Sequence, residues 1–246
     1  MKALILAAGQ GRRLLPLTAD RPKCLVEFGG RSLLQWQLLG LAAAGVNEVV
    51  IVTGFKADRI DEMLRTCTPA GLKVRTLYNP FFEAADNLAS CWIARHELVG
   101  DCLILNGDTL FEPAVAQRLM ATAPRRPITV TIDRKAEGYD DDDMKVKTSE
   151  GNLLAIGKKL PMEQVDGESI GFLRFTAAGM ASFVAAVERI MRTPAGLTLW
   201  YLSVIDQLAR STAEVGVLSI EGLQWGELDF PADVEFNAAM VKDWPQ

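Results

Sequence analysis

Runs with strand character alternate with segments of helical spacing over the first hundred residues, and this rhythm constrains the fold more than any other feature. Strand-like runs occupy residues 1–7, 46–52, 72–77 and 101–105. Segments with apolar residues at helical spacing occupy residues 32–44, 56–65 and 88–97. Strands that alternate with helices at such short intervals predict an α/β fold with a doubly wound, mostly parallel sheet.

The rhythm changes beyond Pro127, where several strand-like runs follow one another without helices between them. Strand-like runs there occupy residues 128–132, 144–148, 152–156, 169–175 and 214–220. Helical spacing occupies residues 177–191, 199–208 and 232–241. Because nothing in the middle has the composition of a linker, the 246 residues are predicted to form one domain, with a first half at about 1–126 and a β-rich capping half at about 127–246.

Composition and charge argue against several classes of protein. The formal net charge is −5, and no block of five basic residues occurs, which argues against a nucleic-acid binder. Four cysteines without a CxxC pair and a single histidine, His96, argue against a zinc site. No apolar stretch reaches the length of a membrane span, so a cytoplasmic protein is expected. The acidic run at 140–143 is predicted to be a solvated loop.

The segment at 6–18, LAAGQGRRLLPLT, follows the first predicted strand and contains a Gly-x-Gly turn. Small residues at such a turn let a phosphate chain approach the backbone N–H groups. The turn is neither a Walker loop, which needs Gly-Lys-Ser/Thr, nor a dinucleotide fingerprint, because Leu14 replaces its third glycine. Arg12, Arg13 and Lys23 place cationic groups beside the turn, which favours a small anionic ligand.

Residues 6–26 resemble the signature of the sugar-1-phosphate and alcohol-phosphate nucleotidyltransferases, L-A-A-G-x-G-T-R-L-x-P-L-T followed by P-K-x-L. Arg12 stands where that signature has threonine, which leaves Arg13 in register. The resemblance implies a Rossmann-like nucleotidyltransferase fold, in which the first half binds the nucleotide and the capping half binds the acceptor. It also implies an enzyme that couples an NTP to a phosphorylated acceptor and releases pyrophosphate.

Two downstream segments are similar to the metal-binding elements of the same family. Asp108 ends the NGD segment at 106–108, and Asp229 lies within WGELDFPAD at 225–233, which is similar to the family's W-x-E-[IL]-D-T-P-x-D. The resemblance implies that both aspartates bind Mg²⁺, and two hard carboxylates suit magnesium chemistry on phosphates. Pro231 and Asp233 are expected to begin the last helix.

Three further segments narrow the branch of the family. Residues 79–90 (NPFFEAADNLAS) are similar to an element of the phosphocholine and inositol-phosphate cytidylyltransferases, as are 142–147 and 166–171. Asp86 and Cys91 depart from the commonest pattern of that branch. The resemblance implies transfer of CMP from CTP to a small phosphorylated alcohol such as phosphocholine.

The resemblance also implies roles for individual residues. Arg13 and Lys23 are expected to act on the phosphates around the reacting phosphorus, with Asp108 and Asp229 as catalytic metal ligands. The residues expected to bind the nucleotide are Leu6, Ala7, Ala8, Gly9, Gly11, Arg12, Asn87, Ser90 and Gly107. The residues expected to bind the acceptor are Lys145, Lys147, Lys158, Glu168, Gly171, Trp200, Tyr201, Trp225 and Glu227.

Several alternatives stay open at this point. The three lysines can equally be surface charges, and Trp200, Tyr201 and Trp225 can either bind a cationic acceptor head or pack between elements. A second enzyme hypothesis is a sugar-1-phosphate, inositol-phosphate or phosphonate nucleotidyltransferase that uses UTP, dTTP or CTP. A third is a non-catalytic nucleotide-binding module. The expected partners are small substrates, without nucleic acid or membrane, and a homodimer is left open.

Overall fold

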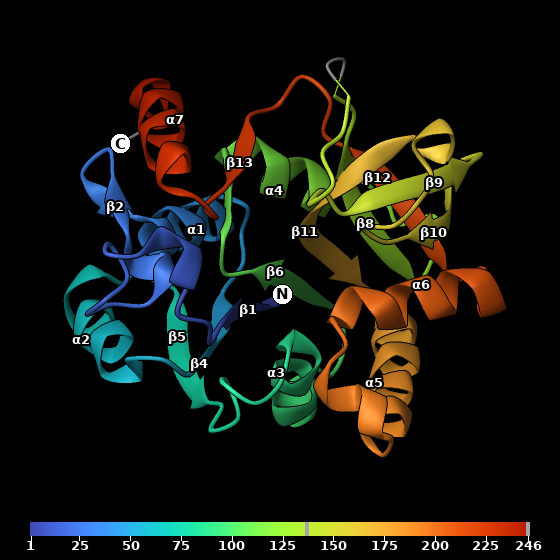
Figure 1. Cartoon of the computed structure of the whole chain (residues 1–246), viewed down its shortest axis with the longest axis horizontal. Helices are drawn as coiled ribbons and strands as arrows, with labels where there is room; N and C mark the ends of the chain where they lie inside the picture. Colours follow the sequence, from blue (N-terminus) through green and yellow to red (C-terminus); the bar gives the residue numbers. More distant parts are fainter. Residues whose placement is uncertain (136–137, 245–246) are drawn as a thin grey trace. The chain divides into compact units, whose positions relative to one another are not determined.

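The apolar run at the start of the chain forms strand β1 (Lys2–Ala7) in the computed structural model, which describes residues 1–135 and 138–244 (Figure 1). The chain divides into two units, each made of several segments. The first comprises Met1–Glu83, Leu105–Met120 and Leu223–Gln246, and the second comprises Ala84–Ile104 and Ala121–Gly222. The predicted halves at about 1–126 and 127–246 remain a prediction.

The first unit contains three parallel strands in the order β5–β4–β1, with helices between them in the sequence. Its strands are β1, β2 (Glu27–Phe28), β3 (Arg31–Ser32), β4 (Glu48–Thr53), β5 (Lys73–Tyr78), β7 (Thr109–Phe111) and β13 (Trp225–Glu227). Its helices are α1 (Leu33–Ala43), α2 (Ala57–Cys67), α4 (Pro113–Ala121, of which the last residue belongs to the second unit) and α7 (Pro231–Met240). Short 3-10 helices at Arg12–Leu14 and Lys23–Leu25 follow β1.

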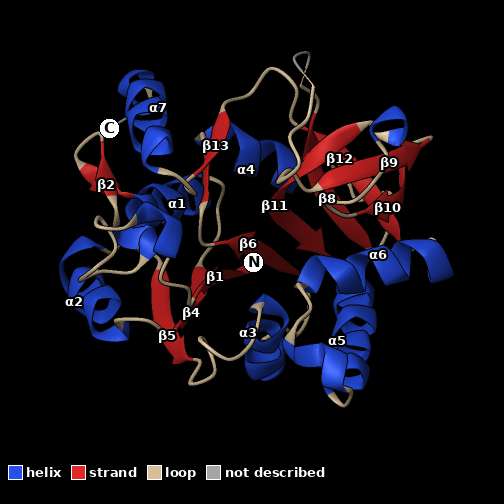
Figure 2. Ribbon diagram, viewed as in Figure 1, coloured by secondary structure: helices blue, strands red, loops and turns tan. Residues whose placement is uncertain are grey.

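The second unit is richer in antiparallel pairs, with the strand order β11–β8–β12–β10–β9. Its strands are β8 (Ile128–Asp133), β9 (Lys145–Ser149), β10 (Asn152–Ile156), β11 (Gly167–Phe175) and β12 (Val215–Ser219), and β6 (Cys102–Asn106) begins in it. Its helices are α3 (Asn87–Ile93), α5 (Ala177–Met191) and α6 (Tyr201–Thr212) (Figure 2). The second unit is therefore rich in strands, and its helices α3, α5 and α6 fall at the helical segments predicted at 88–97, 177–191 and 199–208.

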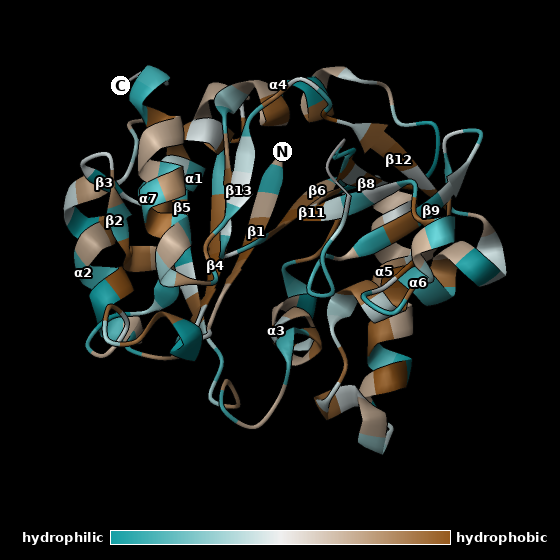
Figure 3. Cartoon of the chain, turned by 45° about the horizontal axis from the view of Figure 1, so that its top comes forward, coloured by the Kyte–Doolittle hydropathy of each residue, from teal (hydrophilic) through white to brown (hydrophobic). Residues whose placement is uncertain are grey.

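Burial of apolar side chains explains the central strands. Val49, Val50, Ile51 and Val52 of β4 are fully buried, as are Ala3 and Ile5 of β1, and these strands carry hydrophobic colours in Figure 3. Strands buried on both faces read as continuous apolar runs, which is why the sequence identifies them. Helix α4 and the short strands β2, β3, β7 and β13 were not predicted from the sequence, and these strands have only two or three residues each.

Candidate active site

The turn after β1 is held by close backbone contacts that only glycine permits at two positions. Gly11 has φ 75°, and a Cβ there would lie 2.8 Å from Cβ of Lys23. Gly107 donates its N–H to the carbonyl of Leu6 at 3.0 Å, and a Cβ there would lie 2.5 Å from that oxygen. The hydroxyl of Thr18 donates to the carbonyl of Gly11 at 2.8 Å. The glycine turn, Lys23 and the segment before Asp108 are therefore packed against one another.

Lys23 links two carboxylates from remote parts of the chain. Its Nζ donates to Oδ2 of Asp108 at 2.8 Å and to Oδ1 of Asp229 at 2.6 Å. The three side chains are 17%, 28% and 31% exposed, so the ion pairs are mostly shielded from water. Burial lowers the pKa of Lys23, but the charges of Asp108 and then Asp229 outweigh this effect and raise the pKa above its ordinary value. The ammonium is therefore charged throughout the neutral range.

Backbone hydrogen bonds fix the position of Asp229. The carboxylate of Asp233, in the first turn of α7, accepts from the backbone N–H groups of Asp229 and Phe230, both at 2.7 Å. The next residue back, Leu228, is fully buried and donates its N–H to the carbonyl of Asp108 at 3.0 Å. Pro231 and Asp233 thus lie in the first turn of the helix, as expected from the sequence, and Asp233 also holds the turn that presents Asp229 to Lys23.

Arg13 lies beside Asp229 and against an aromatic ring. Its Nη1 is 4.0 Å from Oδ2 of Asp229, and its guanidinium carbon is 5.3 Å from the ring centroid of Phe230. A guanidinium group at this distance from an aromatic face gains about 0.5–1 kcal/mol at an exposed site. Phe230 therefore restricts the position of Arg13, although the Arg13 side chain is 53% exposed and the neighbouring Arg12 is exposed as well. The sequence analysis did not identify Phe230, although its place between Asp229 and Pro231 was a usable signal.

Phe230→Leu is expected to lower kcat/KM by about two- to fivefold, because it removes this cation–π contact and keeps an apolar side chain. Arg13→Ala is expected to lower kcat/KM on the order of 10²-fold. In the Arg13→Ala background, Phe230→Leu should cause no further loss of kcat/KM. Steady-state kinetics of the four proteins measures this coupling. The control is Phe236→Leu, since Phe236 is 63% exposed on α7. If Phe230→Leu lowered kcat/KM equally in the wild-type and Arg13→Ala proteins, Phe230 would not act through Arg13.

The carboxylates fit a hard divalent cation. Oδ1 of Asp108 is buried and has no hydrogen-bond partner among residues 1–135 and 138–244. The Lys23 ammonium lies between Oδ2 of Asp108 and Oδ1 of Asp229, so a positive charge already bridges the two carboxylates. Two carboxylates without nitrogen or sulfur ligands suit Mg²⁺, which commonly takes one or two carboxylates and completes its shell with water and substrate phosphates. Within the described residues no cluster of three or more His, Cys, Asp or Glu side chains competes for this role.

Asn87, Ser90, Gly171 and Tyr201 lie in the second unit and contribute to its internal packing. Oδ1 of Asn87 accepts the N–H of Tyr201, the first residue of α6, at 2.9 Å. Tyr201 is fully buried and donates its hydroxyl to the carbonyl of Gly171 at 3.5 Å, and Ser90 is 3% exposed. Their predicted binding roles remain predictions, and the structure shows that Asn87 and Tyr201 also tie α3 to α6.

The three predicted acceptor lysines lie in different surroundings. Lys145 is 1% exposed, and its Nζ donates to the carbonyl oxygens of Asp140, Asp141, Asp143 and Lys158. Lys147 donates to Oε1 of Gln164 at 3.0 Å. The acidic run at 140–143 is therefore more than the solvated loop expected from the sequence, because its carbonyl groups enclose a buried ammonium.

Lys158 lies over Trp200, which is 39% exposed. Its Nζ is 5.1 Å from the centre of the Trp200 ring system and 3.2 Å from Oδ1 of Asp142. Burial raises the pKa of Asp86, and contact with the Trp200 side chain opposes this shift. Trp200 thus has an ammonium on its face and a carboxylate beside it, which is the environment of a cation-binding aromatic residue.

Glu168 is a buried carboxylate paired with a lysine that the sequence analysis missed. Oε1 of Glu168 lies 2.7 Å from Nζ of Lys135, which also contacts Asp143 at 3.2 Å. Burial raises the pKa of Glu168 to about 7, and the Lys135 ammonium opposes the shift. Trp225 and Glu227, the other two predicted acceptor residues, lie on β13 in the first unit.

No helix within the described part of the chain is both long enough and apolar enough to cross a membrane. A family model described as nucleotidyl transferase matches residues 2–140, which is more than half of the chain. This match and the solved structure reported below confirm the α/β fold class expected from the sequence.

Two curated proteins and one solved structure illustrate the similarity. CMP-5'-(3-aminopropyl)phosphonate synthase of Streptomyces rubellomurinus is 34% identical over 95% of this chain and 37% of its own length. CTP:phosphoglutamine cytidylyltransferase of Campylobacter jejuni is 25% identical over 96% of this chain and 98% of its own length. The inositol-1-phosphate CTP transferase structure from T. maritima has a TM-score of 0.81 at 20% identity, covering 100% of this chain and 98% of that one.

Proposed function

The chain belongs to the nucleotidyl transferase family, and from this premise we propose that it transfers CMP from CTP to a small phosphorylated alcohol with a cationic or zwitterionic head. The observation that carries the proposal is the convergence of Lys23, Asp108 and Asp229, with Arg13 beside them, next to a glycine turn. Cationic groups, paired carboxylates and a glycine turn with backbone N–H groups are the parts that phosphoryl and nucleotidyl transfer uses.

The reaction needs no general base. A phosphate monoester has a second pKa near about 6 and is mostly dianionic at neutral pH, so its oxygen can attack the α-phosphorus of CTP directly. The new bond forms between that oxygen and the α-phosphorus, and the bond to the bridging oxygen of pyrophosphate breaks. Arg13 and Lys23 would neutralise the phosphate oxygens, and the backbone at 7–11 would bind the triphosphate.

Asp108 and Asp229 would hold Mg²⁺ during this reaction. The cation would supply charge neutralisation on the triphosphate and the leaving pyrophosphate. Since Lys23 contacts both carboxylates, its ammonium would leave at least one of them when they hold the cation and would then be available to the phosphate oxygens. The chain's own contribution is then positioning and charge, without proton transfer by a side chain.

The preference for CTP rests on similarity. The two curated relatives are named for CMP or CTP, and the solved structure is named for CTP. The segment at 79–90 also resembles the cytidylyltransferase element.

The proposed acceptor head rests on Trp200 and its neighbours. An ammonium, that of Lys158, already lies on the Trp200 face, with Asp142 bound to that ammonium. The two curated relatives are named for an aminopropyl phosphonate and for phosphoglutamine, and both of these compounds contain nitrogen. Phosphocholine is the leading candidate, and its trimethylammonium group would replace the Lys158 ammonium on Trp200.

Trp200→Leu is expected to raise the KM for phosphocholine by about three- to thirtyfold, with Trp200→Phe intermediate, because a desolvated cation–π contact contributes about 0.5–2 kcal/mol. Pyrophosphate release with CTP and a panel of acceptors measures this. The panel contains phosphocholine, phosphoethanolamine, inositol phosphate, an aminoalkyl phosphonate and a hexose 1-phosphate. A higher kcat/KM with inositol phosphate or the hexose 1-phosphate would refute the cationic head, and a higher kcat/KM with UTP or dTTP would refute the CTP preference.

A further inference from the structure

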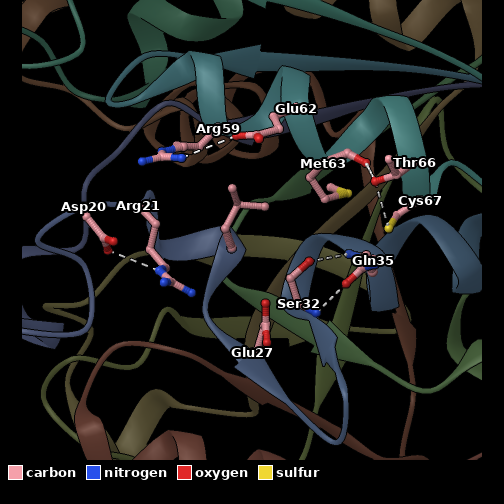
Figure 4. Close-up of a pocket in the computed structure, with 11 residues that line it drawn as sticks. Asp20, Arg21, Glu27, Ser32, Gln35, Arg59, Glu62, Met63, Thr66 and Cys67 are labelled. Atoms are coloured by element: carbon pink, nitrogen blue, oxygen red, sulfur yellow. Dashed lines mark hydrogen bonds and ion pairs between the residues drawn. The ribbon is translucent and has the colours of Figure 1, made fainter.

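A cavity of about 420 Å³ lies on the first unit beside the segment that carries Lys23. Its walls come from residues 20–25, from β2, from the beginning of α1 and from one face of α2 (Figure 4). None of the residues proposed above for catalysis lines it. The cavity is therefore distinct from the candidate active site.

Two arginines provide cationic groups at one end of this cavity. Nε of Arg21 donates to Asp20 at 3.2 Å, and Nη1 of Arg59 donates to Glu62 at a long 3.4 Å. These are the only side-chain contacts of the two guanidinium groups within residues 1–135 and 138–244, so several N–H donors remain for a ligand. Figure 4 shows both guanidinium groups at the same end of the cavity as Asp20.

The positive charges of Arg21 and Arg59 both stabilise the ionised carboxylate of Asp20. The hydrogen bond and charge of Arg21 hold the pKa of Asp20 below its ordinary value, and the more distant Arg59 contributes in the same direction. Two guanidinium groups with spare donors are the usual recognition element for a phosphate or phosphonate dianion, because each can bind its oxygens in bidentate fashion.

Besides Asp20 and Glu62, which pair with the two arginines, the walls provide an apolar surface and a further anionic group. Leu25 and Met63 contribute aliphatic side chains to the cavity. Glu27 is exposed, and its carboxylate makes no hydrogen bond or ion pair within the described residues. A ligand that satisfies all three regions has an anionic end, a short aliphatic chain and an ammonium end.

The cavity is connected to Lys23 through one short helix. Leu25 lines the cavity and belongs to the same 3-10 turn as Lys23, with hydrogen bonds from Leu25 N–H to Pro22 at 2.9 Å and from Val26 N–H to Lys23 at 3.1 Å. A ligand that displaces Leu25 therefore displaces the backbone that sets the direction of the Lys23 side chain.

We propose that this cavity is a regulatory site for a small aliphatic zwitterion whose anionic end is a phosphate or phosphonate, and that its occupation shifts Lys23. Binding to the cavity stands independently of the proposed function, whereas the effect on turnover rests on it. Allosteric couplings of this kind are commonly about 5- to 150-fold in affinity.

Cys67 gives a readout of occupation that does not depend on turnover. Its thiol lines the cavity and is exposed, whereas Cys24, Cys91 and Cys102 are buried. Burial also raises the pKa of the Cys24 thiol to about 12, so alkylation at neutral pH reports on Cys67. Phosphoethanolamine and 2-aminoethylphosphonate, each without CTP, are expected to slow alkylation of Cys67 by iodoacetamide. Ethyl phosphate should protect less, and ethanolamine should not protect.

Variants inside and outside the cavity show whether the ligand that protects Cys67 is bound in the cavity. Arg59→Ala is expected to raise the concentration for half-protection by about tenfold, as loss of a charge-assisted hydrogen bond does. Arg65→Ala, on the same helix but outside the cavity, should leave it unchanged. Glu27→Gln should remove the advantage of phosphoethanolamine over ethyl phosphate. Absence of protection, or equal protection in Arg59→Ala and wild type, would overturn the site.

Measurements of turnover test separately whether occupation of the cavity affects the active site. With a cavity ligand that is itself not consumed, kcat/KM for CTP should change about fivefold or more, and this change should be lost in Arg59→Ala. Protection of Cys67 without any change in turnover would overturn the coupling and leave the binding site. Protection in a protein that shows no transfer from any NTP would leave the site standing and refute the proposed function instead.

Discussion

Replacement of Asp108 by asparagine is expected to lower kcat by about 10³-fold, because it removes one of the two carboxylates proposed to hold Mg²⁺. The substitution preserves the volume of the side chain. Oδ1 of Asp108 has no hydrogen-bond partner in the described chain, and Oδ2 faces the Lys23 ammonium. Steady-state kinetics at several magnesium concentrations measures the loss, and excess magnesium should not restore kcat. Asp229→Asn is expected to behave in the same way.

The control for this pair is Asp58→Asn, since Asp58 is an exposed carboxylate on α2. It should retain wild-type turnover. Circular dichroism and thermal unfolding should show that Asp108→Asn is folded, which separates loss of the metal ligand from loss of structure. Wild-type kcat for Asp108→Asn in magnesium would refute the role of this carboxylate.

Lys23→Met is expected to lower kcat/KM by about 10²- to 10³-fold, because it removes a preorganised charge from the triphosphate. It should also lower the free energy of unfolding by about 1–3 kcal/mol without metal, since two partly buried carboxylates lose their counter-charge. Both effects follow from the contacts at 2.8 Å and 2.6 Å that Lys23 makes with Asp108 and Asp229.

Magnesium should affect this variant more than the wild-type protein. In the absence of Lys23 a divalent cation would replace the positive charge that bridges the two carboxylates, with Arg13 4.0 Å from Asp229 beside it, so Mg²⁺ should raise the melting temperature of Lys23→Met more than that of wild type. The double variant with Asp108→Asn should lose most of this metal-dependent stabilisation. A melting temperature of Lys23→Met that does not respond to Mg²⁺ would refute a metal site at these carboxylates, whatever the activity.

The chain's local pattern was sufficient to predict the strands and helices of the parallel sheet. β1, β4 and β5 and the helices α1 and α2 fall within a few residues of the predicted ranges, because the spacing of apolar residues is set within a window of about ten residues. The glycine turn could also be predicted, since a Gly-x-Gly segment directly after a buried strand constrains its own backbone.

The convergence of the site's side chains depended on the tertiary structure. Lys23 and Asp229 are 206 positions apart in the sequence, so a pattern read over a short stretch of sequence cannot predict their contact. The resemblance to a family assigned Lys23 to the phosphates and Asp229 to the metal, and the ion pair between them was not predicted. The contact of Arg13 with Phe230 and the exposed cavity beside Lys23 were not foreseen, because both join segments that pack together only in the folded unit.

Lys145 shows why residue type and local spacing determine which groups a chain carries but not where each one acts. From its sequence this lysine was a candidate for the acceptor phosphate or an ordinary surface charge, and the structure places it at 1% exposure among four carbonyl oxygens. The sequence by itself determined the alternation of elements, the glycine turn and the presence of two carboxylates and two cations in a recognisable order. The tertiary structure decided which of these charges face each other and which are buried, because burial and pairing depend on surfaces supplied by distant segments.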